Sequence, residues 1–131
     1  MNPGESVVLV DPAYVGYAPI LSALDVEPKI VEALAEHDFL PQLDAIKTAV
    51  DESTRVIFIN TPANPTGAIM SREFLKELSE YCQQEDIWLV CDEVYSMFTS
   101  EKPHISVRTA ATSTTNLVVI DGLSKSHAMS G

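Results

Sequence analysis

The chain has 131 residues, which is enough for one hydrophobic core, and 46% of them are hydrophobic. Its formal net charge of -11 comes from 19 acidic and 8 basic residues, and this charge would repel a phosphate backbone. The apolar runs are too short to cross a bilayer, and no basic and apolar leader opens the chain. We therefore expect a globular, cytoplasmic protein that binds neither nucleic acid nor a membrane.

The two ends of the chain predict a domain that continues on both sides. Met1–Gly4 directly precede a strand-like run, and Gly131 falls inside a motif. Residues 1–131 are therefore expected to form a single partial domain of a longer protein. Cys82 and Cys91 have neither a CxxC spacing nor a secreted context, which predicts reduced, buried thiols and no metal site.

Short apolar runs predict the strands of a sheet. An unbroken run of this kind is typical of a strand that is buried on both faces of a parallel sheet. The runs are Val7–Val10, Val56–Ile59, Ile87–Cys91 and Leu117–Ile120, and Lys29–Val31 is a weaker candidate.

Between these runs, apolar residues recur at helical spacing. Residues 18–24 are compatible with a helix, and Leu43, Ile46, Ala49 and Val50 share one helical face that Pro41 would open. Ser71 is a predicted N-cap for a further helix, whose apolar stripe consists of Phe74, Leu75, Leu78, Tyr81 and Cys82. The alternation predicts an α/β fold, with a largely parallel central sheet flanked by helices.

Polar side chains follow three of the predicted strands. Asn64 lies in a loop rich in Pro, Asn and Gly, Asp92 and Tyr95 follow the next strand, and Lys125 follows the last one. Because the carboxyl ends of parallel strands share one edge, we expect these groups to converge there. Taken singly, each has a plain alternative: a turn residue for Asn64, a helix N-cap for Asp92, a core aromatic for Tyr95 and a solvated amine for Lys125.

Several stretches together resemble the class I/II aminotransferases, which are fold-type I enzymes that use pyridoxal 5'-phosphate. The matching stretches are Asn2–Glu5, Pro12–Tyr14, Asn60–Gly67, Asp92–Tyr95 and Ser124–Gly131. The resemblance covers essentially the whole chain. It implies the central part of the large, cofactor-binding domain of an aspartate-aminotransferase-like enzyme, without that enzyme's N-terminal segment and C-terminal small domain.

The resemblance also implies roles for individual residues. Lys125 corresponds to the lysine that forms an aldimine with the cofactor and then carries the substrate proton. Asp92 corresponds to the carboxylate that pairs with the pyridine nitrogen and keeps it protonated. Asn64 and Tyr95 correspond to the donors that bind the phenolic oxygen of the ring. Tyr14 falls where the family stacks an aromatic ring on the cofactor, and Tyr17 is a neighbouring candidate.

The phosphate contacts are less well defined by the sequence. Many relatives carry a phosphate-binding serine three positions before the lysine, where this chain has Gly122. A backbone amide or Ser124 would then serve the phosphate. The resemblance also implies a cis peptide before Pro65. The three histidines, His37, His104 and His127, are assigned no role.

The function implied by the resemblance is transfer of an amino group between an amino acid and a 2-oxo acid by a homodimeric parent protein. The alternatives are a carbon-sulfur β-lyase of the same fold and a non-catalytic regulatory domain. Retention of Lys125, Asp92 and Tyr95 argues against the regulatory domain. The resemblance leaves the substrate open, an aromatic or other neutral amino acid being one candidate.

The 131-residue piece alone is expected to be inactive, to hold the cofactor poorly and to self-associate. In the family, part of the phosphate site lies upstream of the position of Met1, and an arginine lies a few residues beyond that of Gly131. Exposed sheet edges would favour self-association.

Overall fold

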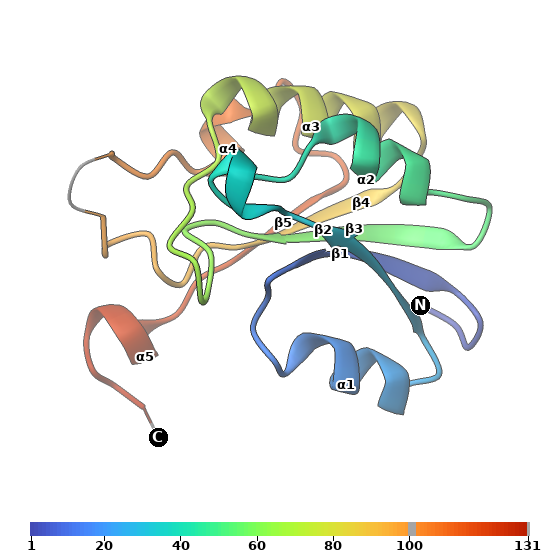
Figure 1. The fold of residues 1–131 in the computed structure, drawn as a ribbon, viewed down its shortest axis with the longest axis horizontal. Helices are drawn as coiled ribbons and strands as arrows, with labels where there is room; N and C mark the ends of the chain where they lie inside the picture. Colours follow the sequence, from blue (N-terminus) through green and yellow to red (C-terminus); the bar gives the residue numbers. More distant parts are fainter. Residues whose placement is uncertain (100–101, 131) are drawn as a thin grey trace.

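The computed structural model describes residues 1–99 and 102–130, and Gly131 of the predicted motif lies outside the described residues. Its strands form one sheet in the order β2-β1-β3-β4-β5, and every pair of neighbours is parallel (Figure 1). The strands are β1 (Ser6–Asp11), β2 (Glu27–Glu32), β3 (Thr54–Asn60), β4 (Trp88–Asp92) and β5 (Leu117–Ile120). The predicted α/β fold with a parallel central sheet is confirmed.

Helices cover both faces of the sheet unequally. In Figure 1, α1 lies on one side of the sheet, and α2, α3 and α4 lie on the other. The helices are α1 (Tyr17–Ala23), α2 (Leu43–Ala49), α3 (Arg72–Gln84), α4 (Val107–Ala110) and α5 (Leu123–Ser126), with a 3-10 turn η1 at Ala35–His37. Each of the first four helices connects two parallel strands, as the crossover rule requires.

The main hydrophobic core lies between the sheet and the α2, α3 and α4 layer. Ile57 of β3, Leu89 of β4 and Leu78 of α3 are at most 1% exposed there. A smaller core on the α1 side contains Val7 and Leu9 of β1. The central strands β1, β3 and β4 are therefore held rigidly, and the loops at their carboxyl ends start from fixed points.

Helix α3 forms as predicted, and its start is locally stabilised. Ser71 is the N-cap, and its Oγ accepts a hydrogen bond of 3.1 Å from the backbone N–H of Phe74. Glu73 lies in the first turn, where a negative charge is favourable. Leu75, Leu78 and Cys82 are buried on one face, which confirms the apolar stripe.

Three local expectations differ from the structure. Strand β5 is not buried on both faces: its Val118 and Ile120 are each 39% exposed, and among the described strands it pairs with β4 alone. Helix α2 begins at Leu43 with Gln42 as its N-cap, so Pro41 precedes the helix instead of opening its first turn. Val50 follows α2 in an extended conformation as its C-cap.

Two local predictions are confirmed, the burial of the two thiols and the cis peptide before Pro65. Cys82 and Cys91 are free and buried, and burial raises the pKa of the Cys82 thiol to about 12. The Asn64–Pro65 peptide is cis, as the resemblance implies, and Asp11–Pro12 and Thr61–Pro62 are cis as well.

Within residues 1–99 and 102–130 there is no cluster of side chains suited to bind a metal ion. None of the described helices has the length and apolar character needed to traverse a membrane.

Candidate active site

The candidate site lies where the chain direction across the sheet reverses. From β1 the chain crosses to β2 on one side, and β3, β4 and β5 follow on the other side. In open α/β sheets this switch point opens a crevice at the carboxyl ends of the strands. Tyr14 follows β1 and Asn64 follows β3, Asp92 ends β4 with Tyr95 in the turn after it, and Lys125 lies on α5 after β5.

Five of the six predicted site residues line one cavity of about 230 Å³ at this edge. They are Tyr14, Asn64, Asp92, Tyr95 and Lys125, and Tyr17 and Val94 complete the lining. An amide, a carboxylate, a phenol and an amine therefore face one space, as the sequence predicted. This donor set fits a ring that offers a basic nitrogen, a phenolic oxygen and a carbonyl carbon.

Asp92, the last residue of β4, is fixed through both oxygens of its carboxylate. Its Oδ2 accepts a hydrogen bond of 2.6 Å from the hydroxyl of Tyr17, and its Oδ1 accepts one of 3.1 Å from the backbone N–H of Val94. The residue is only 9% exposed. A turn follows Asp92 and no helix begins there, so the N-cap alternative does not apply. The carboxylate is held in one orientation toward the cavity.

Tyr17, the first residue of α1, directs its hydroxyl to the carboxylate of Asp92. Its ring packs on Phe58 with centroids 4.6 Å apart, and an edge-to-face contact of 5.3 Å joins it to Tyr14. Burial and the bond to Asp92 raise the pKa of Tyr17 well above its ordinary value. The hydroxyl therefore stays protonated and acts as a donor to Asp92.

Asn64 and Tyr95 approach each other across the cavity. The Nδ2 of Asn64 lies 3.5 Å from the hydroxyl of Tyr95, which is a long hydrogen bond. Both side chains are partly buried and both line the cavity. Their donors are close enough to share one acceptor oxygen, as the predicted contact with a phenolic oxygen needs.

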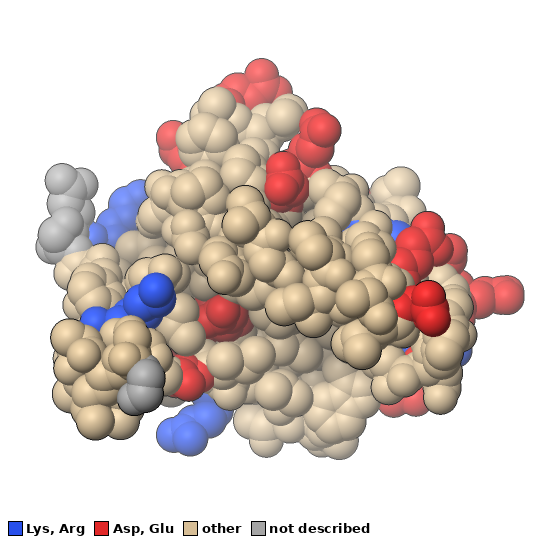
Figure 2. Space-filling view, turned by 90° about the horizontal axis from the view of Figure 1, so that it is seen from below, with Lys and Arg blue, Asp and Glu red and all other residues tan. Residues whose placement is uncertain are grey.

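Lys125 lies on α5 and is exposed. Its Nζ is 5.8 Å from the centroid of the Tyr95 ring, a cation–π distance. Figure 2 shows that the Lys and Arg side chains on this face gather mainly at the end of the molecule where α5 lies. Of the residues that line the cavity, Lys125 is the one basic side chain and Asp92 the one acidic side chain.

Ser124 is the predicted residue that the structure does not bring into the cavity. It precedes Lys125 on α5, is exposed, and its carbonyl accepts a hydrogen bond of 3.4 Å from the Oγ of Ser130. Gly122, the N-cap of α5, is in an extended conformation. The role of Ser124 as a phosphate ligand stays a prediction.

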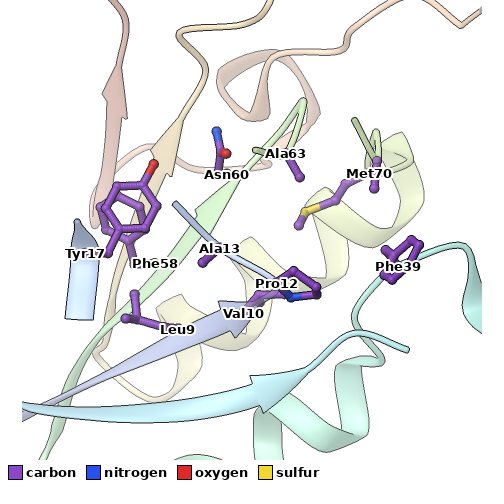
Figure 3. A pocket seen from close by; sticks show the side chains of 11 residues that line it. Leu9, Val10, Pro12, Ala13, Tyr17, Phe39, Phe58, Asn60, Ala63 and Met70 are labelled. Atoms are coloured by element: carbon purple, nitrogen blue, oxygen red, sulfur yellow. The ribbon is translucent and has the colours of Figure 1, made fainter. Parts of the chain in front are cut away.

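A second, much smaller cavity lies behind the first. It has a volume of about 20 Å³, room for about one water molecule. Figure 3 shows Asn60 at the end of β3 between Ala63 on one side and the rings of Tyr17 and Phe58 on the other. This cavity shares Tyr17 with the candidate site, and none of the predicted cofactor ligands lines it.

Three residues beside the site make contacts that were not predicted. Tyr17 was considered for stacking and instead bonds Asp92, and Asn60 bonds the main chain of both Asn64 and Asp92. His104, which was assigned no role, is buried with its Nε2 3.1 Å from the Oε2 of Glu93. One signal was available for Asn60: it is a polar residue that ends a buried apolar run, as Asp92 is.

Comparison with known proteins agrees with this geometry. The family model for aminotransferase class I and II matches residues 1–131. A probable N-acetyl-LL-diaminopimelate aminotransferase of Bacillus subtilis is 35% identical over 131 residues, which are 100% of this chain and 33% of that protein. An aspartate aminotransferase of Pyrococcus abyssi is 31% identical over 132 residues, covering 100% of this chain and 34% of that protein.

Solved structures give the same result. The aromatic aminotransferase of Pyrococcus horikoshii superimposes with a TM-score of 0.92 at 32% identity, over 100% of this chain and 35% of that one. The aspartate aminotransferase of Thermotoga maritima superimposes with a TM-score of 0.94 at 29% identity, over 98% of this chain and 34% of that one. The chain therefore spans about a third of the length of the relatives it matches, and it belongs to the class I and II aminotransferase family.

Proposed function

We propose that the whole protein transfers an amino group between an amino acid and a 2-oxo acid, with pyridoxal 5'-phosphate as its cofactor. The observation that carries the proposal is the single cavity lined by Asp92, Asn64, Tyr95 and Lys125. When bound, the cofactor supplies an electron-accepting ring that stabilises negative charge on the substrate Cα.

Asp92 would bind the pyridine nitrogen through its buried carboxylate. Two donors, the hydroxyl of Tyr17 and the N–H of Val94, already orient that carboxylate and leave lone pairs on both oxygens. A carboxylate held in a site that excludes water keeps a neighbouring pyridinium protonated. Asp92 would thus set the charge of the ring.

Asn64 and Tyr95 would donate hydrogen bonds to the phenolic oxygen of the ring. Their 3.5 Å separation supports a shared acceptor between them. Tyr14 lines the same cavity with an aromatic ring, which supports the predicted stacking role.

Lys125 would hold the cofactor covalently through its Nζ and would then carry a proton to and from the substrate Cα. An amine in these two roles needs access to the cavity and freedom to move, and Lys125 lines the cavity while remaining exposed. Loss of proton transfer alone costs on the order of 10²-fold or more in rate.

The substrate and the assembly are part of the proposal. The relatives include proteins named for aspartate, aromatic amino acids, N-acetyl-LL-diaminopimelate and an arginine–pyruvate pair, so the family covers acidic, aromatic and basic amino acids. We propose a cytoplasmic homodimer whose substrate preference is set by residues outside this chain, since the residues described here supply ring contacts.

We propose that residues 1–131 alone hold the cofactor poorly and do not transaminate. In support, Lys125 and Tyr14 are exposed, so the cavity is open to water.

A substrate screen on the whole protein tests the proposal. Acidic, aromatic and branched amino acids are each supplied with a 2-oxo acid, with and without pyridoxal 5'-phosphate, and Lys125→Ala is the control. Cofactor-dependent transfer that is absent from the control supports the proposal. Release of ammonia and a 2-oxo acid from a cysteine conjugate without amino transfer would instead support the β-lyase, and inactivity with intact cofactor binding would refute transamination.

A further inference from the structure

Asn60 is the last residue of β3, and its side chain connects the main chains of two residues of the candidate site. Its Nδ2 donates a hydrogen bond of 2.9 Å to the carbonyl oxygen of Asp92, and its Oδ1 accepts one of 2.7 Å from the backbone N–H of Asn64. Asn60 is 9% exposed. One buried amide therefore uses both of its ends on residues proposed to contact different atoms of the cofactor ring.

These two hydrogen bonds of the Asn60 side chain form a bridge at the point where the sheet ends. Asn60 and Asp92 are the last register pair of the β3–β4 ladder. Beyond this pair, the ladder is extended by one hydrogen bond of 3.0 Å, from the N–H of Thr61 to the carbonyl of Asp92. The loop that carries Asn64 has left the sheet, so its distance from Asp92 is no longer fixed by strand pairing.

The loop's own bonds do not replace the bridge. The N–H of Ala63 bonds the carbonyl of Ala68 at 2.9 Å, and the N–H of Gly67 bonds the carbonyl of Ala63 at 2.8 Å. These bonds give the loop its internal shape and do not tie it to β4. The bond from the Asn64 N–H to Asn60 is the contact that connects Asn64 itself to the end of the ladder.

We propose that Asn60 is a positioning residue that sets the separation between the carboxylate of Asp92 and the amide of Asn64. Asn60 does not line the cofactor cavity and instead faces the small cavity in Figure 3, so it acts through its two partners. The inference rests on the proposed function, because the separation has a purpose only if one ring spans both groups. Asn60 thus matches the spacing of the two groups to the ring.

Two variants separate the two bonds. Asn60→Ala removes both and leaves the Asn64 N–H without its partner. Asn60→Asp keeps an acceptor for Asn64 but places a carboxylate oxygen against the carbonyl of Asp92, in place of the Nδ2 donor. Asn60→Asp also serves where Asn60→Ala does not fold.

Asn116 provides a matched control. Its Nδ2 also makes two hydrogen bonds to main-chain carbonyls, at 3.3 Å to Cys82 and 3.0 Å to Ile87. It lies just before β5, at the opposite end of the sheet from the candidate site. Asn116→Ala should therefore lower the melting temperature as Asn60→Ala does, without affecting the site.

The first measurement is amide hydrogen exchange in the cofactor-free whole protein. We expect exchange at the Asn64 N–H to accelerate by roughly tenfold or more in Asn60→Ala, and to stay near the wild-type rate in Asn60→Asp and Asn116→Ala. Unchanged exchange at Asn64 in Asn60→Ala would overturn the inference, whatever the cofactor does.

The second measurement is titration with pyridoxal 5'-phosphate, followed by its visible absorbance. We expect Asn60→Ala and Asn60→Asp to weaken binding by about tenfold and to shift the pH at which the bound absorbance changes, while Asn116→Ala stays within about twofold of wild type. Wild-type affinity and an unshifted pH profile in both Asn60 variants would overturn the inference and leave the proposed function intact. Failure of the wild type to bind would defeat the proposed function, and the inference with it.

Discussion

The hydroxyl of Tyr17 donates a hydrogen bond of 2.6 Å to the carboxylate of Asp92, so the start of α1 holds the end of β4 across the sheet. The two residues are 75 positions apart in the sequence, and the bond brings together the loops that follow β1 and β4. The pKa of Tyr17 is raised, so its hydroxyl remains protonated and donates to the carboxylate. A hydrogen bond from a hydroxyl to a carboxylate is one of the stronger kinds.

The Tyr17 contact predicts a specific dependence of stability on pH. Burial and the bond to Asp92 raise the pKa of Tyr17 in the folded protein. In the unfolded chain a tyrosine ionises at about pH 10, so the stabilisation by Tyr17 is complete below that pH and declines as the pH rises above it. The phenylalanine side chain of Tyr17→Phe cannot ionise, so that variant should lack this pH-dependent stabilisation.

Thermal melting of wild type and Tyr17→Phe measures the effect. The wild type should melt at the higher temperature at about pH 8, and its advantage should shrink toward about pH 11. The other tyrosines and both cysteines are common to the two proteins and cancel in the difference. A gap that is constant over this range would contradict the assigned hydrogen bond.

Asp92→Asn tests the charge of the carboxylate separately from its shape. The amide oxygen can still accept from the N–H of Val94 and the amide NH2 can donate to the hydroxyl oxygen of Tyr17, so the fold should be retained. An amide cannot stabilise a pyridinium, and each pKa unit lost there corresponds to about 1.4 kcal/mol. We expect at least about tenfold weaker turnover with an unchanged circular dichroism spectrum. Early melting with normal turnover would show that Asp92 has a structural role only.

Glu93, the neighbour of Asp92, is predicted to serve the fold. It is 4% exposed, its Oε1 accepts a hydrogen bond of 2.8 Å from the N–H of Val107, and its Oε2 lies 3.1 Å from His104. Glu93→Ala would leave the Val107 N–H buried without its partner and would remove the carboxylate beside His104. We expect a loss of about 3 kcal/mol in the free energy of unfolding, measured with urea.

Glu80→Ala is the control for that experiment. Glu80 forms an exposed pair with Lys76 at 3.8 Å on α3. Removing it should change the free energy of unfolding by about 0.5 kcal/mol or less. Equal effects of the two substitutions would mean that the buried Glu93 contacts contribute no more than a surface pair.

The sequence predicts those parts of the fold whose signals are local. The apolar runs place β1, β3 and β4, and Ser71 with its apolar stripe places α3, because capping and periodicity depend on neighbouring residues. Strand β5 was located correctly, but its burial was not. A run such as Leu117–Ile120 does not reveal how many strands pair with it or which segments cover its faces.

For the candidate site, the sequence predicts the members and not their connections. The parallel sheet brings Asn64, Asp92, Tyr95 and Lys125 to one edge, which topology alone allows. The bonds of Tyr17 and Asn60 to Asp92 depend on side-chain directions across strands that are far apart in the sequence. Such long-range hydrogen bonds leave no periodic pattern in the chain.

We propose that Lys125 is the residue that holds the cofactor. Borohydride reduction of the cofactor-loaded whole protein fixes the cofactor on the lysine that carries it, and peptide mapping then identifies that residue. We predict a single labelled peptide that contains Lys125, with no label in Lys125→Ala. A cofactor adduct on any other lysine of the reduced wild-type protein, with Lys125 unmodified, would contradict the account.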